Sequence, residues 1–495
     1  MSNYGVKTKI RGILKVVIYM KQSLAIIVNR LVTLACKILK PIFHKDGSVT
    51  PGYYASKLDK DILDKLKYPK YIIGVTGSSG KGSTTSVIAH ILENSGYKVV
   101  WNKSGSNLFN AAATLILNNT NPFTKKINAD VLLLELDESF IKRIFNKVKL
   151  THLVITNITR DQPARNGHPD IIFNKIESSF DSNTHIIINA DDPIVSKLRY
   201  THKGQVTTYG IAKTDYSLKE PLSNTIDACY CPLCESKLKY AYYHYGHVGS
   251  YKCPSCKFNR NPVDYEAKDV DLEKQFMTIN KSIIRLDKNV FFATYYTLAA
   301  YALCNTIGLT NEQIQKQLND NPKKSKRMKS YYLGRRQVEM IESKNENALS
   351  YLQSINYIKN EKKTKTIILG FDNVSRRYEY NDLSWLYDVD FELLNDNPID
   401  KIFVIGRFRY DVYNRLIHAN INKDKLVLVD DLNNIINLVK KKSKGKIFTM
   451  VCFDMTAIIK KKLTDKLMLE KYPDAKIRML LPEKKKDKVD KGLDF

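Results

Sequence analysis

The sequence predicts an α/β protein whose main domain is a doubly wound, parallel sheet with a phosphate-binding loop. Short buried strands alternate with helical stretches over much of the chain, and one of these strands runs straight into a Gly/Ser-rich loop. A second series of strands and helices begins near Arg335. With 495 residues, 43% of them apolar, the chain is long enough for two or three separate cores.

The first elements of the main domain surround the loop. A strand is expected at Tyr71–Val75, and a helical pattern follows from Ser83 to Ser95. Further strands are expected at Val131–Leu136, His152–Thr156 and His185–Asn189. A strand, a glycine loop and a helix in this order form the entry of a parallel sheet with a phosphate site at the helix N-terminus.

The alternation stops at Pro221–Asp264, where cysteines cluster among tyrosines and polar residues. Helices are expected again at Ala293–Ile307 and Asn311–Leu318, followed by a Lys-rich linker at Pro322–Ser330. The second α/β unit begins after that linker. Its expected strands are Thr366–Leu369, Lys401–Ile405, Lys425–Val429 and Lys446–Val451.

The N-terminal segment is basic and partly apolar. Up to Lys45 it carries nine Lys or Arg and no acidic residue. Ile10–Phe43 is interrupted by Lys15, Lys21, Arg30 and Lys37, which argues against a membrane-spanning helix. Two interpretations stay open: a basic amphipathic helix on an anionic membrane surface, or a helix packed on its own domain. After it, Gly47–Gly52 is expected to be a loop and Asp59–Leu66 a short helix.

The formal net charge of +28 points to an anionic partner. Nucleic acid, an acidic membrane surface and a phosphorylated substrate all fit, and so does a Lys-rich solvated surface without any partner. The eight cysteines do not suggest a disulfide scaffold in a chain of this length. No signal peptide with a cleavage site is evident.

The loop Thr76-Gly-Ser-Ser-Gly-Lys-Gly-Ser-Thr84 predicts a nucleotide triphosphate site. Its glycines let backbone N–H groups approach phosphate oxygens, Lys81 neutralises phosphate charge, and Ser83 is placed to meet Mg²⁺. The first glycine lies only three residues before the second, so the loop is not a strict Walker A motif. The candidate nucleotide-binding residues are Thr76, Gly77, Ser78, Ser79, Gly80, Lys81, Gly82, Ser83 and Thr84.

Two CxxC pairs predict a zinc ribbon. Cys231-Pro-Leu-Cys234 and Cys253-Pro-Ser-Cys256 are separated by 18 residues, a spacing that suits four thiolates on one tetrahedral ion. Cys229 lies just outside the first pair and is expected to be a spare thiol. The expected role of such a zinc ion is structural, because a ribbon usually folds a local segment.

The loop variant TGxxGKxST resembles the phosphate loop of Mur ligases and folylpolyglutamate synthases. Other segments resemble the Mur ligase family in the same order along the chain. These are Thr156–Gln162 with Gly167, and Asn189–Pro193 with Tyr209-Gly210. Within Leu133–Glu138, the resemblance implies that Glu135 binds Mg²⁺ and takes part in catalysis together with Lys81.

Within that family the chain is most similar to the MurT branch, which carries a four-cysteine insert in its nucleotide-binding domain. Gly47–Gly52, Gly105-Ser-Asn107, Asp161-Gln162, Asp382–Glu392 and Gly406–Asp411 with Arg415 resemble MurT segments. The resemblance implies nucleotide contacts by Asn107 and Arg335. It covers nearly all of the chain from Gly47 to the basic tail.

The resemblance implies an ATP-dependent ligase subunit that amidates the α-carboxyl of D-glutamate in the lipid II stem peptide. The acid would be activated as an acyl phosphate, and ammonia would come from a GatD-type glutaminase. In the MurT branch, an aspartate of a DNAAD motif completes the catalytic triad of that glutaminase. Asp372-Asn373 matches its first two positions, so Asp372 is the candidate orienting carboxylate. The implied location is cytoplasmic, peripheral at the inner face of the plasma membrane.

The resemblance also implies domain bounds. Residues 1–46 form the basic N-terminal segment, and 47–325 the Mur ligase central ATP-binding domain with a zinc-ribbon insertion at about 225–264. Residues 331–482 form a Rossmann-like C-terminal α/β domain, and 483–495 a charged tail. The expected cofactors are ATP, Mg²⁺ and structural Zn²⁺.

The sequence departs from the MurT pattern in several places. Val-Ser-Arg follows Asp372-Asn373 where the branch has Ala-Ala-Asp, and Phe292–Thr297 lacks the branch's usual asparagines. Lys344-Asn345 is followed by Glu346 instead of proline. Two alternatives therefore stay open: a paralogous ligase acting on another carboxylate, and a non-catalytic nucleotide-binding or nucleic-acid-binding protein. Nucleic acid is not the expected partner.

Overall fold

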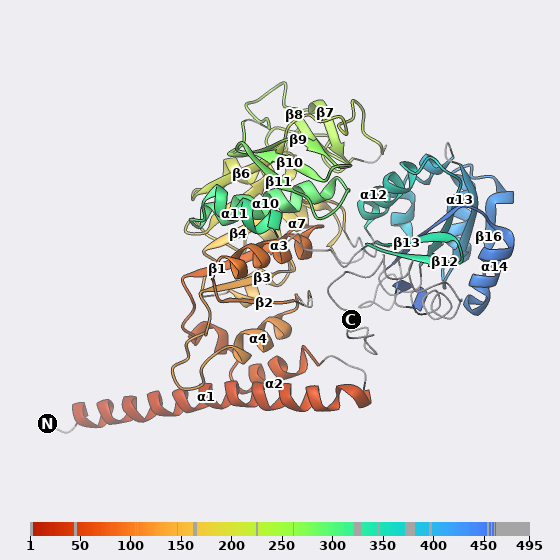
Figure 1. Cartoon of the computed structure of the whole chain (residues 1–495). Coiled ribbons are helices and arrows are strands. Elements are labelled where there is room, and N and C mark those ends of the chain that lie inside the picture. The colour runs from red at the N-terminus through yellow and green to blue at the C-terminus, as the bar shows by residue number, and fades with distance from the viewer. Residues whose placement is uncertain are drawn as a thin grey trace. The chain divides into compact units, whose positions relative to one another are not determined.

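The computed structural model divides into two compact units (Figure 1). It describes residues 3–461 except 44–46, 104, 106, 146, 162–165, 224–225, 261, 321–327, 344–346, 372–381, 396–397, 453–454, 457 and 460. Side chains are described from Tyr19, except those of residues 41–43, 328–331 and 342. The first unit consists of Met1–Thr159, His168–Pro221 and Ile226–Lys324, and the second of Arg160–Gly167, Leu222–Thr225 and Ser325–Phe495.

The first unit is built on a nine-stranded sheet of order β11-β10-β9-β6-β5-β4-β1-β3-β2. Its strands are β1 (Tyr71–Thr76), β2 (Val99–Trp101), β3 (Val131–Glu135), β4 (His152–Ile155), β5 (His185–Asn189), β6 (Val206–Ile211), β9 (Tyr265–Asp271), β10 (Phe276–Ile279) and β11 (Ser282–Arg285). The seven neighbouring strands β9, β6, β5, β4, β1, β3 and β2 of this sheet all pair in parallel. The predicted parallel α/β fold is therefore confirmed.

An antiparallel edge extends this sheet beyond the prediction. β10 pairs antiparallel with both β9 and β11. Asn280 and Lys281 join β10 to β11 with φ of 46° and 68°, the left-handed conformations that a two-residue hairpin turn requires. The two short strands that flank this turn alternate buried and partly exposed residues and lack the continuous buried apolar runs by which the central strands were recognised.

Helices cover the sheet of the first unit. They are α3 (Lys81–Asn94), α4 (Phe109–Asn118), α5 (Ile141–Ile144), α7 (Pro169–Glu177), α8 (Pro193–Ser196), α9 (Leu198–Thr201), α10 (Phe292–Thr306) and α11 (Asn311–Asp320). The most buried is α10, which packs against α3, β6 and β9. Its buried face is rich in alanine, which lets it lie close to the sheet, and the hydroxyls of Tyr295 and Tyr296 donate to Asp191 and Asp287.

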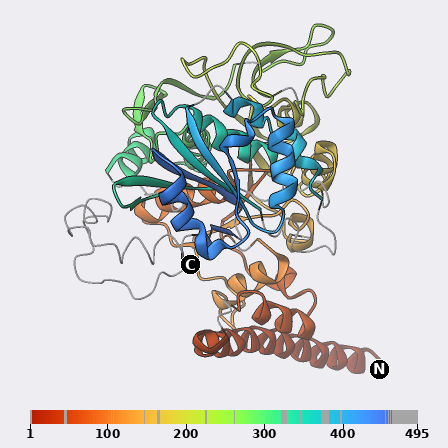
Figure 2. The ribbon, with the colours of Figure 1, turned by 90° about the vertical axis from the view of Figure 1, so that its right-hand side faces the viewer.

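The N-terminal elements pack at the β2 edge of this unit (Figures 1 and 2). They are α1 (Asn3–Phe43), α2 (Thr50–Leu58) and the 3₁₀ turn η1 (Ile62–Lys65). By length and composition, Tyr19–Lys40 of α1 would suffice to cross a membrane, and 17% of that stretch is buried. The four charged residues weighed against spanning therefore do not exclude it on composition.

The loop expected at Gly47–Gly52 is wrong in its second half, because α2 already begins at Thr50. Pro51 lies in the first turn of α2, where its missing N–H and fixed φ are compatible with a helix. Gly52 lies directly against α4, and its N–H donates to Thr114 Oγ1 at 2.8 Å. The glycine that suggested a loop therefore permits close helix packing.

A separate two-stranded hairpin carries the cysteine-rich insertion. Its strands are β7 (Lys239–Tyr245) and β8 (Val248–Lys252), paired antiparallel. Behind them a small core packs two of the cysteines with three other side chains: Cys231, Leu238, Tyr251, Cys253 and Phe258. Tyr251 and Phe258 stack with their ring centroids 5.4 Å apart.

The second unit has a six-stranded sheet of order β12-β13-β17-β14-β15-β16. Its strands are β12 (Met328–Leu333), β13 (Arg336–Ser343), β14 (Lys365–Gly370), β15 (Ile399–Ile405), β16 (Leu426–Leu428) and β17 (Lys446–Cys452). Its helices are α12 (Ala348–Lys359), α13 (Arg409–His418) and α14 (Ile435–Lys442), with 3₁₀ turns at Ser384–Asp388, Phe391–Leu394, Lys423–Lys425 and Leu432–Asn434.

Two features stabilise the second unit. Tyr351, Phe371 and Trp385 form a buried aromatic cluster with ring centroids 5.0–5.3 Å apart. The guanidinium of Arg415 donates to both carboxylate oxygens of Glu392 at 2.9 Å. The linker expected at Pro322–Ser330 overlaps β12, because that strand already begins at Met328.

The close packing at Gly52 generates a stability prediction. A Cβ at this position would lie 2.1 Å from Asn110 O and 2.8 Å from Thr114 N, so α2 and α4 would have to separate. We expect Gly52→Ala to lower the free energy of unfolding by about 1–3 kcal/mol, measured by urea denaturation. Ser56→Ala on the same helix is the matched control, because its buried Oγ has no hydrogen-bond partner among the residues that the structure describes. Equal stability of the two variants would contradict this packing.

Candidate functional site

The phosphate loop turns sharply between β1 and α3. Gly77 and Gly80 have φ of +125° and +81°, conformations that favour glycine, and α3 begins at Lys81. A Cβ on Gly77 would lie 2.4 Å from Thr156 Oγ1 and 2.7 Å from Asn157 O. The loop therefore lies directly against the segment that follows β4, and both glycines are required by geometry.

Hydrogen bonds from that segment fix the conformation of the loop. The side chain of Asn157 accepts from Ser79 N at 3.0 Å and donates to Ser79 O at 3.1 Å. Thr156 Oγ1 donates to Ser79 O at 2.7 Å, and Ser78 N donates to Asn157 O at 2.8 Å. Since Ser79 is held from both sides, the N–H groups of the loop are preorganised for phosphate oxygens.

Lys81 lies inside the loop and pairs with Glu138. Its Nζ is 2.6 Å from Glu138 Oε1, and the two side chains are only 9% and 3% exposed. The same Nζ also donates to Gly77 O. A buried ion pair of this kind holds the ammonium within the loop, and removing Glu138 would leave a buried charge uncompensated.

Glu135 is the last residue of β3, which pairs in parallel with β1, the strand that leads into the phosphate loop. Asn102 holds the backbone there, since its Oδ1 accepts from Glu135 N at 2.9 Å and its Nδ2 donates to Glu135 O at 3.0 Å. Glu135 Oε2 lies 3.5 Å from the position that a Cβ on Gly105 would take. The predicted Mg²⁺ carboxylate therefore faces the segment that contains Gly105 and Asn107.

Asp191 is a buried carboxylate just beyond β5. It accepts from Ile211 N at 2.7 Å, from Arg260 Nε at 2.5 Å and from Tyr295 OH at 2.8 Å. Burial disfavours the Arg260 cation, but the Asp191 charge outweighs this effect and raises the pKa of Arg260. Burial, helped by Asp191, raises the pKa of Tyr295, which therefore stays a neutral donor.

Asp192 links the neighbouring turn to the phosphate loop. It accepts from Ile158 N at 2.8 Å and from the first amides of α8 at 2.8 and 3.2 Å. The Nε2 atom of His247, in the insertion hairpin, lies 3.2 Å from Oδ1, the same oxygen that accepts from the α8 amides. Burial opposes protonation of His247, but Asp192 outweighs burial and raises the pKa of this imidazole.

The four predicted cysteines lie together. Their Sγ atoms are all within 4.8 Å of one another, with Cys231–Cys256 at 3.6 Å and Cys234–Cys253 at 3.5 Å. Four thiolates around a tetrahedral zinc ion would be about 3.8 Å apart. Backbone N–H groups of Leu233 and Ser255 point at Cys231 and Cys253 Sγ. The donor set therefore fits a metal ion.

Two predicted residues belong to the second unit. Arg335 is exposed in the turn between β12 and β13, and Asp372 lies outside the described residues, as do Lys344-Asn345. The roles predicted for Asp372 and Arg335 stay predictions.

Sequence reasoning missed several residues that contact the loop or Asp191. Glu138 was visible only as one of three carboxylates in Glu135–Glu138, and the turn after β3 decides which of them faces Lys81. Asn157 lay in a recognised segment, but its contact with Ser79 joins residues far apart in sequence. Tyr295 lies in the stretch that lacks the usual asparagines, and its hydroxyl binds Asp191.

Comparison with known families gives two matches. Residues 344–457 match the family described as MurT ligase C-terminal, and residues 75–240 match the Mur ligase middle domain. The subunit MurT of the glutamine-hydrolyzing lipid II isoglutaminyl synthase of Staphylococcus aureus (strain COL) is 30% identical over 381 residues, 76% of this chain and 84% of that protein. The subunit of the same name from Streptococcus pneumoniae (strain R6) is 27% identical over 404 residues, 80% and 87% of the two chains.

Solved structures show the same fold. A pseudomurein peptide ligase type C from Methanothermus fervidus has a TM-score of 0.62 at 20% identity, over 82% of this chain and 80% of that one. MurF ligase from Thermotoga maritima, in complex with ADP, has a TM-score of 0.53 at 17% identity, over 85% and 84%. These similarities extend over both units of the described chain.

The hydrogen bonds at Ser79 generate a binding prediction. We expect Asn157→Ala to weaken MgATP binding about tenfold, equivalent to ~1.4 kcal/mol, because the loop loses its support from both Asn157 side-chain atoms. Titration with a fluorescent ATP analogue measures the change. The matched control is Asn94→Ala at the far end of α3, where the amide nitrogen contacts His90 O at 2.7 Å and His90 Nδ1 at 3.1 Å, away from the loop. A wild-type affinity in Asn157→Ala would refute the preorganised loop.

Proposed function

Because this chain belongs to the MurT family of Mur ligases, we propose that it amidates the α-carboxyl of D-glutamate in the lipid II stem peptide to D-isoglutamine. It is an ATP-dependent carbon–nitrogen ligase with glutamine as the amido donor, and it acts in peptidoglycan synthesis. The observation that carries the proposal is that a chain of this family also has a phosphate loop with the geometry that such a ligase needs.

The reaction consumes one carboxylate, one ATP and one ammonia. The carboxylate oxygen attacks the γ-phosphorus, the bond to the ADP oxygen breaks, and an acyl phosphate forms. Ammonia then attacks the acyl carbon and loses a proton, and inorganic phosphate leaves to give the amide. The protein's task is to position the phosphoryl donor and acceptor and to neutralise the transferring charge.

The residues of the loop supply that positioning. The N–H groups of Ser78 and Ser79 hold the loop on Asn157, and those at the start of α3 would meet phosphate oxygens. The Lys81 ammonium would then leave Glu138 and pair with the phosphate charge. Mg²⁺ would supply further positive charge at the β- and γ-phosphates, with Ser83 and Glu135 as its protein ligands. We assign Asn107 and Arg335 to the nucleotide as well. Glu138 keeps the Lys81 ammonium in place before the nucleotide binds.

We propose that the ammonia comes from a partner, because the relatives are subunits of a glutamine-hydrolyzing synthase. Four of the eight cysteines form the ribbon cluster, and Cys304 is buried in α10, where burial raises the pKa of its thiol and opposes thiolate formation. We infer a GatD-type glutaminase as the second subunit, with Asp372 as the carboxylate that orients the catalytic histidine of that subunit. Asp372 would then serve glutamine hydrolysis and not phosphoryl transfer.

We assign a structural Zn²⁺ to Cys231, Cys234, Cys253 and Cys256. Metal there would stabilise the hairpin whose Tyr251 hydroxyl donates to Ala190 O at 3.0 Å. The ribbon would thereby support the turn that carries the buried carboxylates Asp191 and Asp192.

The protein works on the cytoplasmic side of the plasma membrane, as a peripheral protein, because its substrate is anchored there.

The zinc assignment predicts a measurable metal content. We expect about one zinc ion per chain by elemental mass spectrometry, and its loss in Cys253→Ser together with a lower melting temperature. Cys229→Ser is the matched control, because that thiol lies outside the four-sulfur cluster and should leave zinc bound. A zinc content unchanged in Cys253→Ser would overturn the assignment.

The proposed activity predicts a mass change in the substrate. The protein, purified with its glutaminase, should convert one stem-peptide carboxyl of lipid II to an amide with MgATP and glutamine. We expect Lys81→Ala to lower this rate about 100-fold with any nitrogen donor, because the transferring phosphoryl loses its cation. Asp372→Ala should lower only the glutamine-dependent rate, by about 100-fold, and ammonium chloride should restore it.

Two other outcomes would contradict the proposed activity, and a third would contradict the role of Asp372. An unchanged stem peptide, with ATP hydrolysed when another carboxylate and a free amino acid are supplied, would identify a paralogous ligase. A protein that binds ATP without hydrolysing it in the presence of any of these substrates would identify a non-catalytic partner. Asp372→Ala that is impaired equally with glutamine and with ammonium would remove Asp372 from the glutaminase triad.

A further inference from the structure

The helix α1 carries an exposed apolar stripe on the side that its own unit does not cover. Large side chains recur at spacings of four and three residues, which places them along one face of a helix. They are Met20, Leu24, Ile27, Leu31, Leu34 and Ile38, each between 38% and 65% exposed. From Met20 to Ile38 the stripe is about 27 Å long.

The opposite face of α1 is already occupied. Gln22, Ala25, Ile26 and Asn29 are buried against the unit. Asn29 Nδ2 donates to Thr114 O at 3.2 Å and to Asn118 Oδ1 at 2.9 Å. These bonds orient the helix along the β2 edge, with α2 and α4 on its inner side (Figure 1). The exposed stripe is therefore a fixed outer face of the folded unit.

Basic side chains flank the stripe on both sides. At 100° per residue, Lys21 lies on one flank, and Arg30 and Lys37 lie on the other; all three are exposed. The sequence has no acidic residue before Asp46. An apolar line between cations has the pattern of a helix that lies in the plane of an anionic membrane surface.

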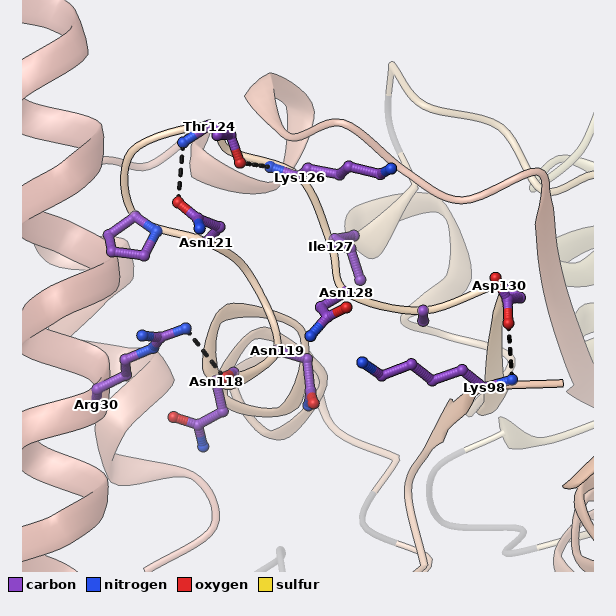
Figure 3. Close-up of a pocket in the computed structure, with 12 residues that line it drawn as sticks. Arg30, Lys98, Asn118, Asn119, Asn121, Thr124, Lys126, Ile127, Asn128 and Asp130 are labelled. Atoms are coloured by element: carbon purple, nitrogen blue, oxygen red, sulfur yellow. Dashed lines mark hydrogen bonds between the residues drawn. The ribbon is translucent and has the colours of Figure 1, made fainter.

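A pocket beside α1 adds further positive charge (Figure 3). Its volume is about 480 Å³, and Arg30, Lys98 and Lys126 line it together with Asp130 and several asparagines. Arg30 is held at its edge, because its Nη2 donates to Thr120 O at 2.7 Å. Three cations against one carboxylate suit the phosphate of a lipid headgroup.

We propose that this outer face of α1 is a membrane-docking surface that lies on anionic phospholipid, with the stripe among the acyl chains and the basic flanks among the headgroups. The proposal specifies the surface for the peripheral location proposed above and rests on it. It does not depend on the amidation chemistry.

A second copy of the chain fits the stripe less well than lipid. Paired helices with apolar seams are usually joined by Glu–Lys contacts at the flanking positions. Here those positions hold Lys21, Arg30 and Lys37 without a carboxylate, so two copies would bring cations together. A spanning helix would have to break the bonds of Asn29 and Arg30 to the unit and carry Arg30 into the hydrocarbon.

Flotation of the full-length protein with lipid vesicles, without nucleotide, tests this docking. We expect the protein to float with phosphatidylcholine–phosphatidylglycerol vesicles, at least about tenfold less with phosphatidylcholine alone, and less at high salt. Leu24→Glu combined with Leu31→Glu should lower flotation at least about tenfold, because both charges would enter the apolar layer. The matched control is Ile283→Glu, an exposed apolar position on β11 that should float like the wild type.

Each contrary result identifies another occupant. Wild-type protein that does not float but is dimeric by light scattering, and becomes monomeric with the two substitutions, would assign the stripe to a second copy. Protein that resists alkaline carbonate extraction from membranes would indicate a spanning helix. If the double variant still amidates a water-soluble lipid II analogue at the wild-type rate, the lost flotation reports docking alone; wild-type protein that floats but amidates nothing would refute the function and leave the docking intact.

Discussion

Two adjacent buried carboxylates, Asp191 and Asp192, hold the parts of the first unit in register. A buried charge is tolerated only when donors surround it, and each of these carboxylates takes donors from several distant segments. Asp192 binds the backbone at Ile158, next to the residues that support the phosphate loop. Asp191 binds Arg260 and Tyr295, which lie beyond the ribbon hairpin and on α10. The loop, the insertion and the core helix are therefore coupled through one turn.

The sequence predicted what depends on local pattern. The parallel sheet, the phosphate loop and the four clustered cysteines follow from strand periodicity, glycine placement and CxxC spacing, all of which act within short stretches. Contacts between distant stretches did not follow. The pairing of Lys81 with Glu138, and the support of Ser79 by Asn157, depend on how strand ends meet in the folded sheet. Gly52 suggested a loop because glycine disfavours helices, yet tertiary packing against α4 outweighs that preference.

The site and the family support different parts of the functional account. The geometry of the loop suits phosphoryl transfer, because preorganised N–H groups and a buried ammonium are what a transferring phosphoryl group requires. Family membership supports glutamine as the amido donor, and the relatives' name is the basis for proposing lipid II as the acceptor. Docking of the outer face of α1, as proposed, would help the protein to meet an acceptor confined to a membrane, since binding to the same surface raises the local concentration of both.

The central claim is that the carboxylate of the substrate is activated by ATP as an acyl phosphate before ammonia attacks it. Lipid II labelled with ¹⁸O in the α-carboxylate of its D-glutamate tests this claim most directly, with the inorganic phosphate analysed by mass spectrometry after turnover with MgATP and glutamine. The account predicts that one ¹⁸O moves to phosphate and the other stays in the amide. Unlabelled phosphate accompanying the amide, or release of AMP and pyrophosphate in place of ADP, would contradict it.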